Sequence, residues 1–262
     1  MTGTQRTRAN FSTTLDKGMK ILAAFNERET HLTNQQIAER IGVSRPTVAR
    51  LTSTLVELGY MKKDKARFRL SWRMVPLANP LRGKNHAIES ADAAMKRIAN
   101  EFGGAASIGT IDRLNFMYLK TVRSRENIWG GPDIGTVGRI LPTSIGWALC
   151  SLMTDEELGV FVEEVKAATP ETWERHGADF RLGVESCRTL GSCKSSGALH
   201  PDIDAVAAPL LRDDNGDCFA VNFRAPRYML GVNQIEEEIA PRLRSLATAI
   251  RDMGQLVRPA GP

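Results

Sequence analysis

Arginine and hydroxyl side chains recur at helical spacing between residues 44 and 54, and such groups can bind DNA. They donate hydrogen bonds to phosphate oxygens and to the edges of bases. The candidate contacts on this face are Ser44, Arg45, Pro46, Thr47, Arg50, Ser53 and Thr54. The apolar residues of the same segment fall on the other face: Val48, Leu51, Leu55 and Leu58. Their spacing predicts a helix that buries one side and leaves its polar side open.

A second, shorter helix is predicted immediately before this one. Thr33 and Gln36 have the spacing of a capping box, so this helix should begin near Asn34. Thr33 is also a further candidate DNA contact. Gly42 stands where a helix end favours positive φ, and Ser44 is a good N-cap for the next helix. Two short helices joined by a tight turn form a helix-turn-helix, whose second helix enters the major groove of DNA.

The segment after these helices predicts a β-hairpin wing. Residues 67–70 alternate between polar and apolar, which is typical of a strand with one wet face. A charged tip at residues 63–65 suits a position beside the phosphates. The candidate phosphate contacts are Lys62, Lys63, Lys65 and Arg67. Upstream, apolar residues at helical spacing predict a first helix that packs beneath the pair: Leu15, Met19, Leu22 and Phe25.

The surplus of positive charge belongs to the part of the chain that holds these motifs. The 262 residues, enough for two domains of ordinary size, carry a formal net charge of +5. Residues 1–86 contain 16 lysines and arginines against 6 aspartates and glutamates, whereas residues 87–262 contain 19 against 24. Counterion release from phosphates favours a basic surface. We therefore expect the first part to bind double-stranded DNA and the acidic second part not to touch it.

No membrane span and no signal peptide are predicted. The sequence has no apolar run of the roughly 18 residues that a transmembrane helix needs. Residues 1–13 contain Arg6 and Arg8 but no apolar segment follows them, so we expect a flexible basic arm there. These features predict a cytoplasmic protein without a membrane partner.

Little in the sequence supports a metal site, a cofactor or catalysis. The four cysteines lack C-x-x-C spacing and the four histidines are scattered, so no metal site is predicted. Asp202 and Asp204 lie near His200, but a solvated loop accounts for them better. Cys187 and Cys193 leave a redox-sensing pair as a hypothesis beside the interpretation as reduced thiols. No G-x-S-x-G, P-loop or G-x-G-x-x-G occurs, and we therefore expect neither an enzyme nor a cofactor.

The second part predicts an α+β domain. A DNA-binding domain at residues 14–72 is followed by a linker helix and loop at residues 73–88, with the boundary near His86. Helices are then predicted at residues 89–102, 144–153, 154–168, 171–190 and 233–257. Strands are predicted at residues 106–112, 116–122, 136–141, 204–211 and 218–224, with residues 192–197 as a turn. Helices that flank an antiparallel sheet are typical of a ligand-sensing domain, here residues 89–262.

Four segments together carry a family resemblance over essentially the whole chain. They are DKGMKILAAF and LTNQQIAERIGVSRPTVARLTSTLVELGY in the first half, and GRILPTSIGWAL and DAVAAPLLRDDNGDCFAVNFRAP in the second. In this order they resemble the IclR family of transcriptional regulators. The resemblance implies an N-terminal winged helix-turn-helix domain, a linker helix, and a C-terminal GAF-like α+β domain that binds a small organic acid effector. It also implies self-association as a dimer or a tetramer.

The same resemblance implies which residues bind the effector. The family places the effector's carboxylate at the start of the helix after the strand at residues 136–141, which here is Ser144, Ile145 and Gly146. Free N–H groups and the helix dipole suit such a helix start to an anion. Pocket side chains are expected at Asn222 and Arg224, whose alternation along a strand lets both point the same way.

Two positions depart from the family's pattern. Trp147 stands where the family often has Lys or Arg, and Arg224 stands where a small polar residue is common. Arg224 could bind a carboxylate bidentately, or could pair with an internal Asp or Glu. Trp129 and Trp147 could form an aromatic wall for the effector, or could pack in the core or at a subunit interface.

These features predict a sequence-specific transcriptional regulator of a catabolic operon, controlled by a small organic acid, with aromatic acids among the candidates. Repression is the commoner mode in the family, although activators share its motifs. The alternative is a constitutive or architectural DNA-binding factor whose C-terminal domain only oligomerises.

Overall fold

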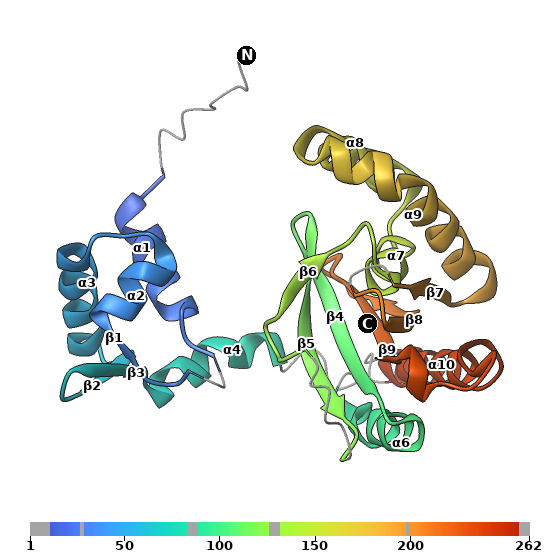
Figure 1. The fold of residues 1–262 in the computed structure, drawn as a ribbon, viewed down its shortest axis with the longest axis horizontal. Helices are drawn as coiled ribbons and strands as arrows, with labels where there is room; N and C mark the ends of the chain where they lie inside the picture. The colour runs from blue at the N-terminus through green and yellow to red at the C-terminus, as the bar shows by residue number, and fades with distance from the viewer. Residues whose placement is uncertain (1–10, 27–28, 83–88, 126–131, 198–199, 257–262) are drawn as a thin grey trace, which may run out of the picture. The chain divides into compact units, whose positions relative to one another are not determined.

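The structure is a computed structural model that describes residues 11–26, 29–82, 89–125, 132–197 and 200–256 (Figure 1). The chain divides into two compact units, residues 1–84 and residues 85–262. The predicted boundary at His86 and most of the predicted N-terminal arm lie outside the described residues.

Three helices and a small antiparallel sheet form the first unit. The helices are α1 (Thr13–Ala23), α2 (Asn34–Ile41) and α3 (Arg45–Glu57). The strands are β1 (Leu32–Thr33), β2 (Met61–Asp64) and β3 (Arg67–Leu70), in the order β1-β3-β2. The fully buried apolar residues of this unit come from all these layers and include Ile21, Leu32, Ile37, Val48 and Met61. The arrangement is the predicted winged helix-turn-helix.

Local signals explain where the helices of the motif begin and end. Thr33 caps α2, and the predicted capping box with Gln36 is present in both directions. Gly42 ends α2 with φ at 67°, a left-handed conformation that glycine adopts without a steric penalty. The turn between the two helices was therefore predictable from these three residues.

Three apolar side chains that were predicted to be buried are exposed instead. Leu15 and Met19 on α1 are 64% and 57% exposed, and Leu58, just beyond α3, is 51% exposed. Ile21 of α1 and its C-cap residue Ala24 lie in the core, and Leu22 and Phe25 of the predicted stripe pack against it. The first half of the stripe, Leu15 and Met19, therefore lies outside the face that packs. The chain turns away at Leu58, which leaves that side chain outside the core.

The linker begins directly after the wing. A 3-10 turn, η1 (Trp72–Met74), leads into α4 (Val75–Arg82), which contains Pro80. Within the linker predicted at residues 73–88, the helix therefore runs to residue 82, and residues 83–88 lie outside the described residues.

A six-stranded antiparallel sheet organises the second unit, in the order β6-β5-β4-β9-β8-β7. Its strands are β4 (Ala105–Asp112), β5 (Asn115–Arg123), β6 (Val137–Arg139), β7 (Cys193–Ser196), β8 (Ile203–Arg212) and β9 (Cys218–Pro226). Its α-helices are α6 (Asp92–Phe102), α7 (Ser144–Cys150), α8 (Asp155–Ala168), α9 (Pro170–Leu190) and α10 (Ala240–Leu256). Two further turns are η2 (Arg227–Met229) and η3 (Ile235–Ile239), of which η3 is π-helical.

The sheet has helices on both faces, and each face has its own apolar core (Figure 1). On one face α6 and α10 pack against alternate strand residues such as Val221 and Phe223. On the other face α7 lies against the sheet, with α8 and α9 beyond it. The sheet is therefore buried on both sides, and its α7 face is where the predicted effector residues lie.

One predicted element was wrong. Residues 192–197 were interpreted as a turn, but Cys193–Ser196 form β7, an edge strand that pairs with β8. The segment is short and rich in serine, so no local signal of a strand exists, and pairing with β8 decides its structure. The last helix also begins later than predicted, as η3 at Ile235.

Candidate DNA-binding surface and effector site

The predicted recognition face of α3 is open to solvent. Arg45, Pro46, Arg50, Ser53 and Thr54 are exposed and Thr47 is half-buried. The opposite face packs into the core through Val48 and Leu51. The exposed face therefore presents two guanidinium groups and several hydroxyl groups along one helix.

Several hydroxyl groups on this surface have partners within the protein, among them that of Thr54, which donates to the Arg50 carbonyl oxygen at 3.1 Å. Ser44 occupies the N-cap position of α3, but its side chain makes no capping bond and instead bonds the Thr47 hydroxyl at 2.9 Å. Ser44 is therefore not the side-chain cap that the sequence predicted. Thr33 Oγ1 bonds the Gln36 side chain and backbone, each at 3.2 Å, so its hydroxyl is already engaged in capping α2.

The position of α3 depends on a residue that the sequence interpretation missed. Thr52 is fully buried, and its hydroxyl donates to the side-chain oxygen of Asn34 at 3.0 Å. This bond joins α3 to the first residue of α2. Thr52 follows Val48 by four residues, so helical spacing alone would have placed it on the buried face.

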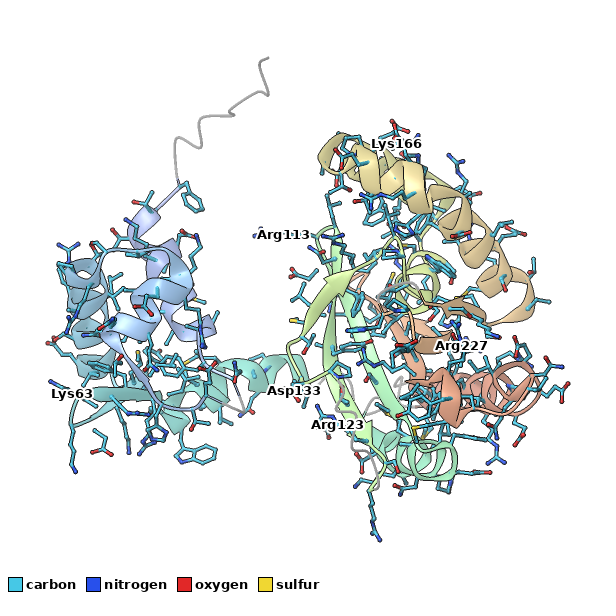
Figure 2. The ribbon with its side chains drawn as sticks, viewed as in Figure 1. Lys63, Arg113, Arg123, Asp133, Lys166 and Arg227 are labelled. Carbon is cyan, nitrogen blue, oxygen red and sulfur yellow. The ribbon has the colours of Figure 1, made fainter. Side chains whose placement is uncertain are left out.

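The wing carries the predicted phosphate contacts at its solvent-facing positions. Lys62, Lys63, Lys65 and Arg67 are all exposed on or between β2 and β3. Figure 2 shows Lys63 on this hairpin. The wing is anchored by the buried residues Met61 and Phe68, so the charged side chains extend from a fixed hairpin.

Strand register brings the predicted effector residues of β9 onto one face of the sheet. Asn222 pairs with Ser107 on one side and Ala207 on the other. Arg224 pairs with Ala105 and Ala205 in the next row of the same face. The intervening residue, Phe223, lies in the core on the opposite face. The prediction that Asn222 and Arg224 point the same way is therefore confirmed by the geometry.

A buried polar cluster connects these two residues through Tyr118 on β5. Asn222 Nδ2 donates to the Tyr118 hydroxyl at 3.2 Å, and both side chains are buried. The half-buried Arg224 guanidinium also bonds this hydroxyl. Burial raises the pKa of Tyr118, while the nearby Arg224 charge and the bond from Asn222 act in the opposite direction. Burial lowers the pKa of Arg224, but a guanidinium stays protonated at neutral pH.

The start of α7 differs from the open anion site that was expected. The Gly146 N–H donates to Thr143 Oγ1 at 3.3 Å, and the Ser144 N–H donates to Ser195 Oγ at 3.1 Å. These two amide donors are thus satisfied within the protein. Ser144, Ile145 and Gly146 are all buried. A ligand could use these backbone N–H groups only by displacing the present partners.

Buried polar atoms near this face include two on uncharged side chains that lack a hydrogen-bond partner among the described residues. They are Asn222 Oδ1 and Ser144 Oγ, on side chains that are only 2% and 1% exposed. Leaving a buried acceptor unpaired is costly, and native proteins rarely do so without a ligand, water or functional reason.

Trp147 belongs to the core rather than to an aromatic wall. Its Nε1 donates to the Leu141 carbonyl oxygen at 2.6 Å, and its ring lies against Gly183 of α9. Core packing, the alternative interpretation for this residue, is therefore confirmed. Trp129 lies outside the described residues.

A second arginine on the same face of the sheet was not anticipated. Arg123 on β5 pairs with Ala105, the residue that also pairs with Arg224 on the other side. Its guanidinium forms an ion pair with Asp133, as Figure 2 shows for the two labelled side chains. The register of three strands thus brings Arg123 and Arg224 into one row, a relationship that spans about a hundred residues of sequence and that has no local signal.

Among the described residues, the cysteines and the surroundings of His200 form no group that could hold a metal ion. All four cysteines are free and buried, and burial raises the pKa of Cys218 to about 11. Asp204 is not in a solvated loop as predicted, since it is buried in β8 and pairs with Arg227 at 3.0 Å. Within the described ranges no group of three or more His, Cys, Asp or Glu residues could hold a metal ion. Among those residues no helix is both long and apolar enough to cross a membrane.

Known proteins match both units. Residues 14–65 match the IclR helix-turn-helix domain, and residues 83–252 match the family described as bacterial transcriptional regulator IclR C-terminal. The HTH-type transcriptional regulator TsaQ1/TsaQ2 of Comamonas testosteroni is 25% identical, over 94% of this chain and 89% of that protein. The p-hydroxybenzoate hydroxylase transcriptional activator of Acinetobacter baylyi is also 25% identical, over 91% and 90%. The crystal structure of an IclR family transcriptional regulator from Brucella abortus is 28% identical and superposes with a TM-score of 0.72, covering 97% of this chain and 96% of that one.

Proposed function

The chain belongs to the IclR family of bacterial transcriptional regulators, which are not enzymes, and from this premise we propose that it represses a catabolic operon under the control of an organic acid. The proposal has three parts: a DNA contact surface, an effector site and an assembly. The observation that carries it is the pairing of an exposed basic recognition helix in one unit with a buried polar cluster in the other.

The proposed DNA contacts come from α3 and the wing. Arg45, Thr47 and Arg50 would meet base edges or nearby phosphates, while Lys63 and its neighbours on the wing would hold the backbone. Exposure of the α3 side chains and anchoring of the helix through Thr52 support this assignment. The basic surplus of residues 1–86 supports it independently.

The proposed assembly is a dimer or a pair of dimers. Two copies of α3 would enter successive major grooves, with half-sites spaced by about 34–36 Å or a multiple of that distance. Leu15 and Met19 support self-association, because they lie four residues apart on α1 and are exposed. A dimer also explains how an effector can act, since it can change the spacing of two recognition helices.

The proposed effector is a carboxylic acid that binds on the α7 face of the sheet. Arg224 supplies a charge suited to bidentate recognition of a carboxylate, and it lies beside Asn222 and Tyr118. Entry requires the surrounding chain to open, because Asn222 and Ser144 are almost fully buried. Binding can therefore shift the regulator between two arrangements, by as much as its affinity differs between them. The name of the Acinetobacter relative makes aromatic acids the first class to test.

A constitutive DNA-binding factor would not need this polar cluster. A domain that serves only to oligomerise is expected to fill its interior with apolar groups, whereas this one buries Asn222 Oδ1 and Ser144 Oγ without partners among the described residues. This difference favours the effector-controlled regulator over the architectural alternative.

The test is fluorescence anisotropy of the purified protein on DNA from immediately upstream of its own gene, compared with random duplex over a salt series. Each titration is run with and without a mixed pool of aromatic and short aliphatic acids. Selective binding that the pool changes is the expected result. Selective binding that no acid changes would contradict the proposal of an effector. Absence of selective binding would contradict the proposed operator contacts. A reporter gene fused to the same DNA distinguishes repression from activation. Repression requires higher expression of the reporter when the gene that encodes this protein is deleted.

A further inference from the structure

The hydroxyl group of Thr52 is an exception in the core of the first unit. Among the described residues of this unit, Thr52 is the one polar residue that is buried, and it is fully buried. The buried residues beside it on α3, Val48 and Leu51, are apolar. Valine would fill the same space without the cost of taking a hydroxyl group out of water. Packing alone therefore does not account for threonine at this position.

This hydroxyl group has one acceptor on its own helix and one on α2. It donates to the Ala49 carbonyl oxygen at 3.1 Å and to Asn34 Oδ1 at 3.0 Å. A hydroxyl group carries a single proton, so either acceptor alone is enough to satisfy it. Threonine inside a helix commonly bonds its own backbone in the way that Thr52 bonds Ala49. The bond to Asn34 is therefore not needed to satisfy the buried donor, and its specific effect is to join α3 to α2.

Asn34 also lies beside the wing. It is the first residue of α2 and directly follows β1, whose Thr33 pairs with Arg67 of the wing strand β3. The bond to Thr52 thus attaches α3 to the wing through β1. This attachment is additional to the chain that leads from the end of α3 into β2. The two elements that carry the proposed DNA contacts are therefore held to each other at two places.

The bond acts on the inner side of α3 and fixes what its outer side presents. Thr52 follows Arg50 by two residues, which places it about 200° further around the helix. Apolar contacts such as those of Val48 and Leu51 have no preferred direction, so they resist a small rotation of α3 only weakly. A hydrogen bond is directional and opposes such a rotation. Holding Thr52 in place therefore fixes the direction in which Arg50 points.

We infer that Asn34 and Thr52 are positioning residues for the selectivity of DNA binding, because their bond aligns the side chains of α3 that read bases with the side chains of the wing that hold phosphates. The inference rests on the proposed function and deepens it, from the residues that would touch DNA to the pair that aligns them. Contacts to bases need placement within roughly 0.5 Å, whereas phosphate contacts carry no sequence information. The bond can favour the aligned arrangement only by its own net free energy, which corresponds to about threefold to tenfold in affinity.

The test measures the affinity of the full-length protein for DNA from immediately upstream of its own gene and for random duplex, by fluorescence anisotropy over a salt series. Thr52→Val keeps the shape of the side chain and removes the hydroxyl group. Its selectivity, the ratio of the two affinities, should fall about threefold to tenfold. Its affinity for random duplex and the slope against salt should stay those of the wild type. Thr52→Ser keeps the hydroxyl group and loses a buried methyl group, so it should melt at a lower temperature but retain the selectivity.

Asn34→Ala removes the same bond without changing the core. Asn34 is only half-buried, and the Thr52 hydroxyl keeps the Ala49 carbonyl oxygen as its acceptor. This variant should lose as much selectivity as Thr52→Val. The double variant should lose no more than either single one, because both substitutions remove one bond. Gln35→Ala is the matched control, since Gln35 is the next residue, is exposed, and bonds Glu39 within α2 at 3.0 Å. Its selectivity should be that of the wild type.

The outcomes separate the inference from the function on which it rests. Wild-type selectivity in Thr52→Val and Asn34→Ala would overturn the inference, while the proposed DNA contacts would stand. Equal losses on both duplexes, or additive losses in the double variant, would show that the pair only supports the fold and would overturn it as well. If Thr52→Val does not fold, Asn34→Ala decides by its selectivity and its loss on random duplex. Absence of selectivity in the wild type would overturn the proposed operator contacts, and the inference with them.

Discussion

Gly183 on α9 lies so close to the indole ring of Trp147 on α7 that a Cβ atom at position 183 would be 2.1 Å from Cε3 of that ring. The ring is held by the hydrogen bond from its Nε1 to the Leu141 carbonyl oxygen. It cannot turn away without breaking this buried bond. Trp147 stands where the family often has Lys or Arg, and its ring therefore requires glycine at position 183 of α9.

Gly183→Ala is expected to destabilise the second unit by about 1–3 kcal/mol, because the added methyl group overpacks a buried contact. Gly159→Ala on α8 is the matched control, since no atom lies within 4 Å of a Cβ there. Alanine at position 159 should instead stabilise the helix by roughly 0.5–1 kcal/mol. Urea unfolding followed by tryptophan fluorescence compares the two. A similar change at both positions would show that Trp147 can move.

The helix-turn-helix was predictable because its signals are local. The capping box of Thr33 and Gln36 and the glycine at position 42 lie within ten residues of each other and set both helix ends. Alternation along residues 218–226 likewise predicted that Asn222 and Arg224 share a face. In each case a short-range rule of hydrogen bonding or periodicity is sufficient.

The remaining features depend on contacts that are distant in the sequence. β7 exists because Cys193–Ser196 pair with β8, and four residues rich in serine carry no strand signal of their own. Pairing across three strands brings Arg123 into the row of Arg224. The Ser144 N–H is occupied by Ser195, which lies 51 residues further along the chain. The prediction of which apolar side chains are buried failed for a related reason. Leu15 and Met19 are apolar, but they lie beside the face that α1 buries.

Stability of the second unit should fall in acid through the ion pair between Glu157 and Arg212. The carboxylate of Glu157 accepts two bonds from Arg212, at 2.7 and 2.5 Å, and one from the Thr154 N–H. Arg212 chiefly, and then the Thr154 amide, lower the pKa of Glu157 from 4.5 to about 2. A depressed pKa contributes stability above the unfolded value of 4.5, and this contribution is lost as the pH falls toward about 2.

Glu157→Gln isolates this charge, because glutamine can keep the capping box but cannot pair with Arg212. The wild type should melt at a higher temperature than the variant at pH 7, and the difference should disappear between pH 4.5 and about 2. Glu174→Gln, at an exposed position on α9, is the control. Melting temperatures over this pH range provide the measurement. A constant difference down to pH 2 would assign the effect to packing and not to charge.

Arg50→Ala should weaken binding to the operator by about 1–3 kcal/mol if Arg50 reads a guanine. The loss on random duplex should be much smaller, because a base contact carries sequence information and a phosphate contact does not. Arg113→Ala is the control, since Arg113 is exposed at the β4–β5 turn of the acidic unit. Anisotropy on both duplexes makes the comparison. Equal losses on operator and random DNA would reassign Arg50 to the phosphates.

Lys63→Ala tests the wing in a different way. Loss of one phosphate contact should lower affinity for operator and random DNA alike, and should reduce the slope of log affinity against log salt by about 1. Lys166→Ala removes the same charge from α8 and should change neither value (Figure 2). The measurement is the same titration repeated over a salt series. An unchanged slope in Lys63→Ala would place the wing away from the DNA backbone.

Arg224→Ala should abolish the response to the effector and leave DNA binding intact. Arg224 lies in the sheet of the acidic unit, whereas the proposed DNA contacts belong to the other unit, so the two functions should separate. Arg227→Ala is the matched control: it removes a guanidinium three residues away, which is exposed and pairs with Asp204. Dose–response curves for the active acid, read as anisotropy of operator DNA, compare the three proteins. An unchanged curve in Arg224→Ala would mean that this arginine bonds Tyr118 within the protein and does not bind the effector. Loss of operator binding by this variant in the absence of any acid would mean that Arg224 is needed for the fold.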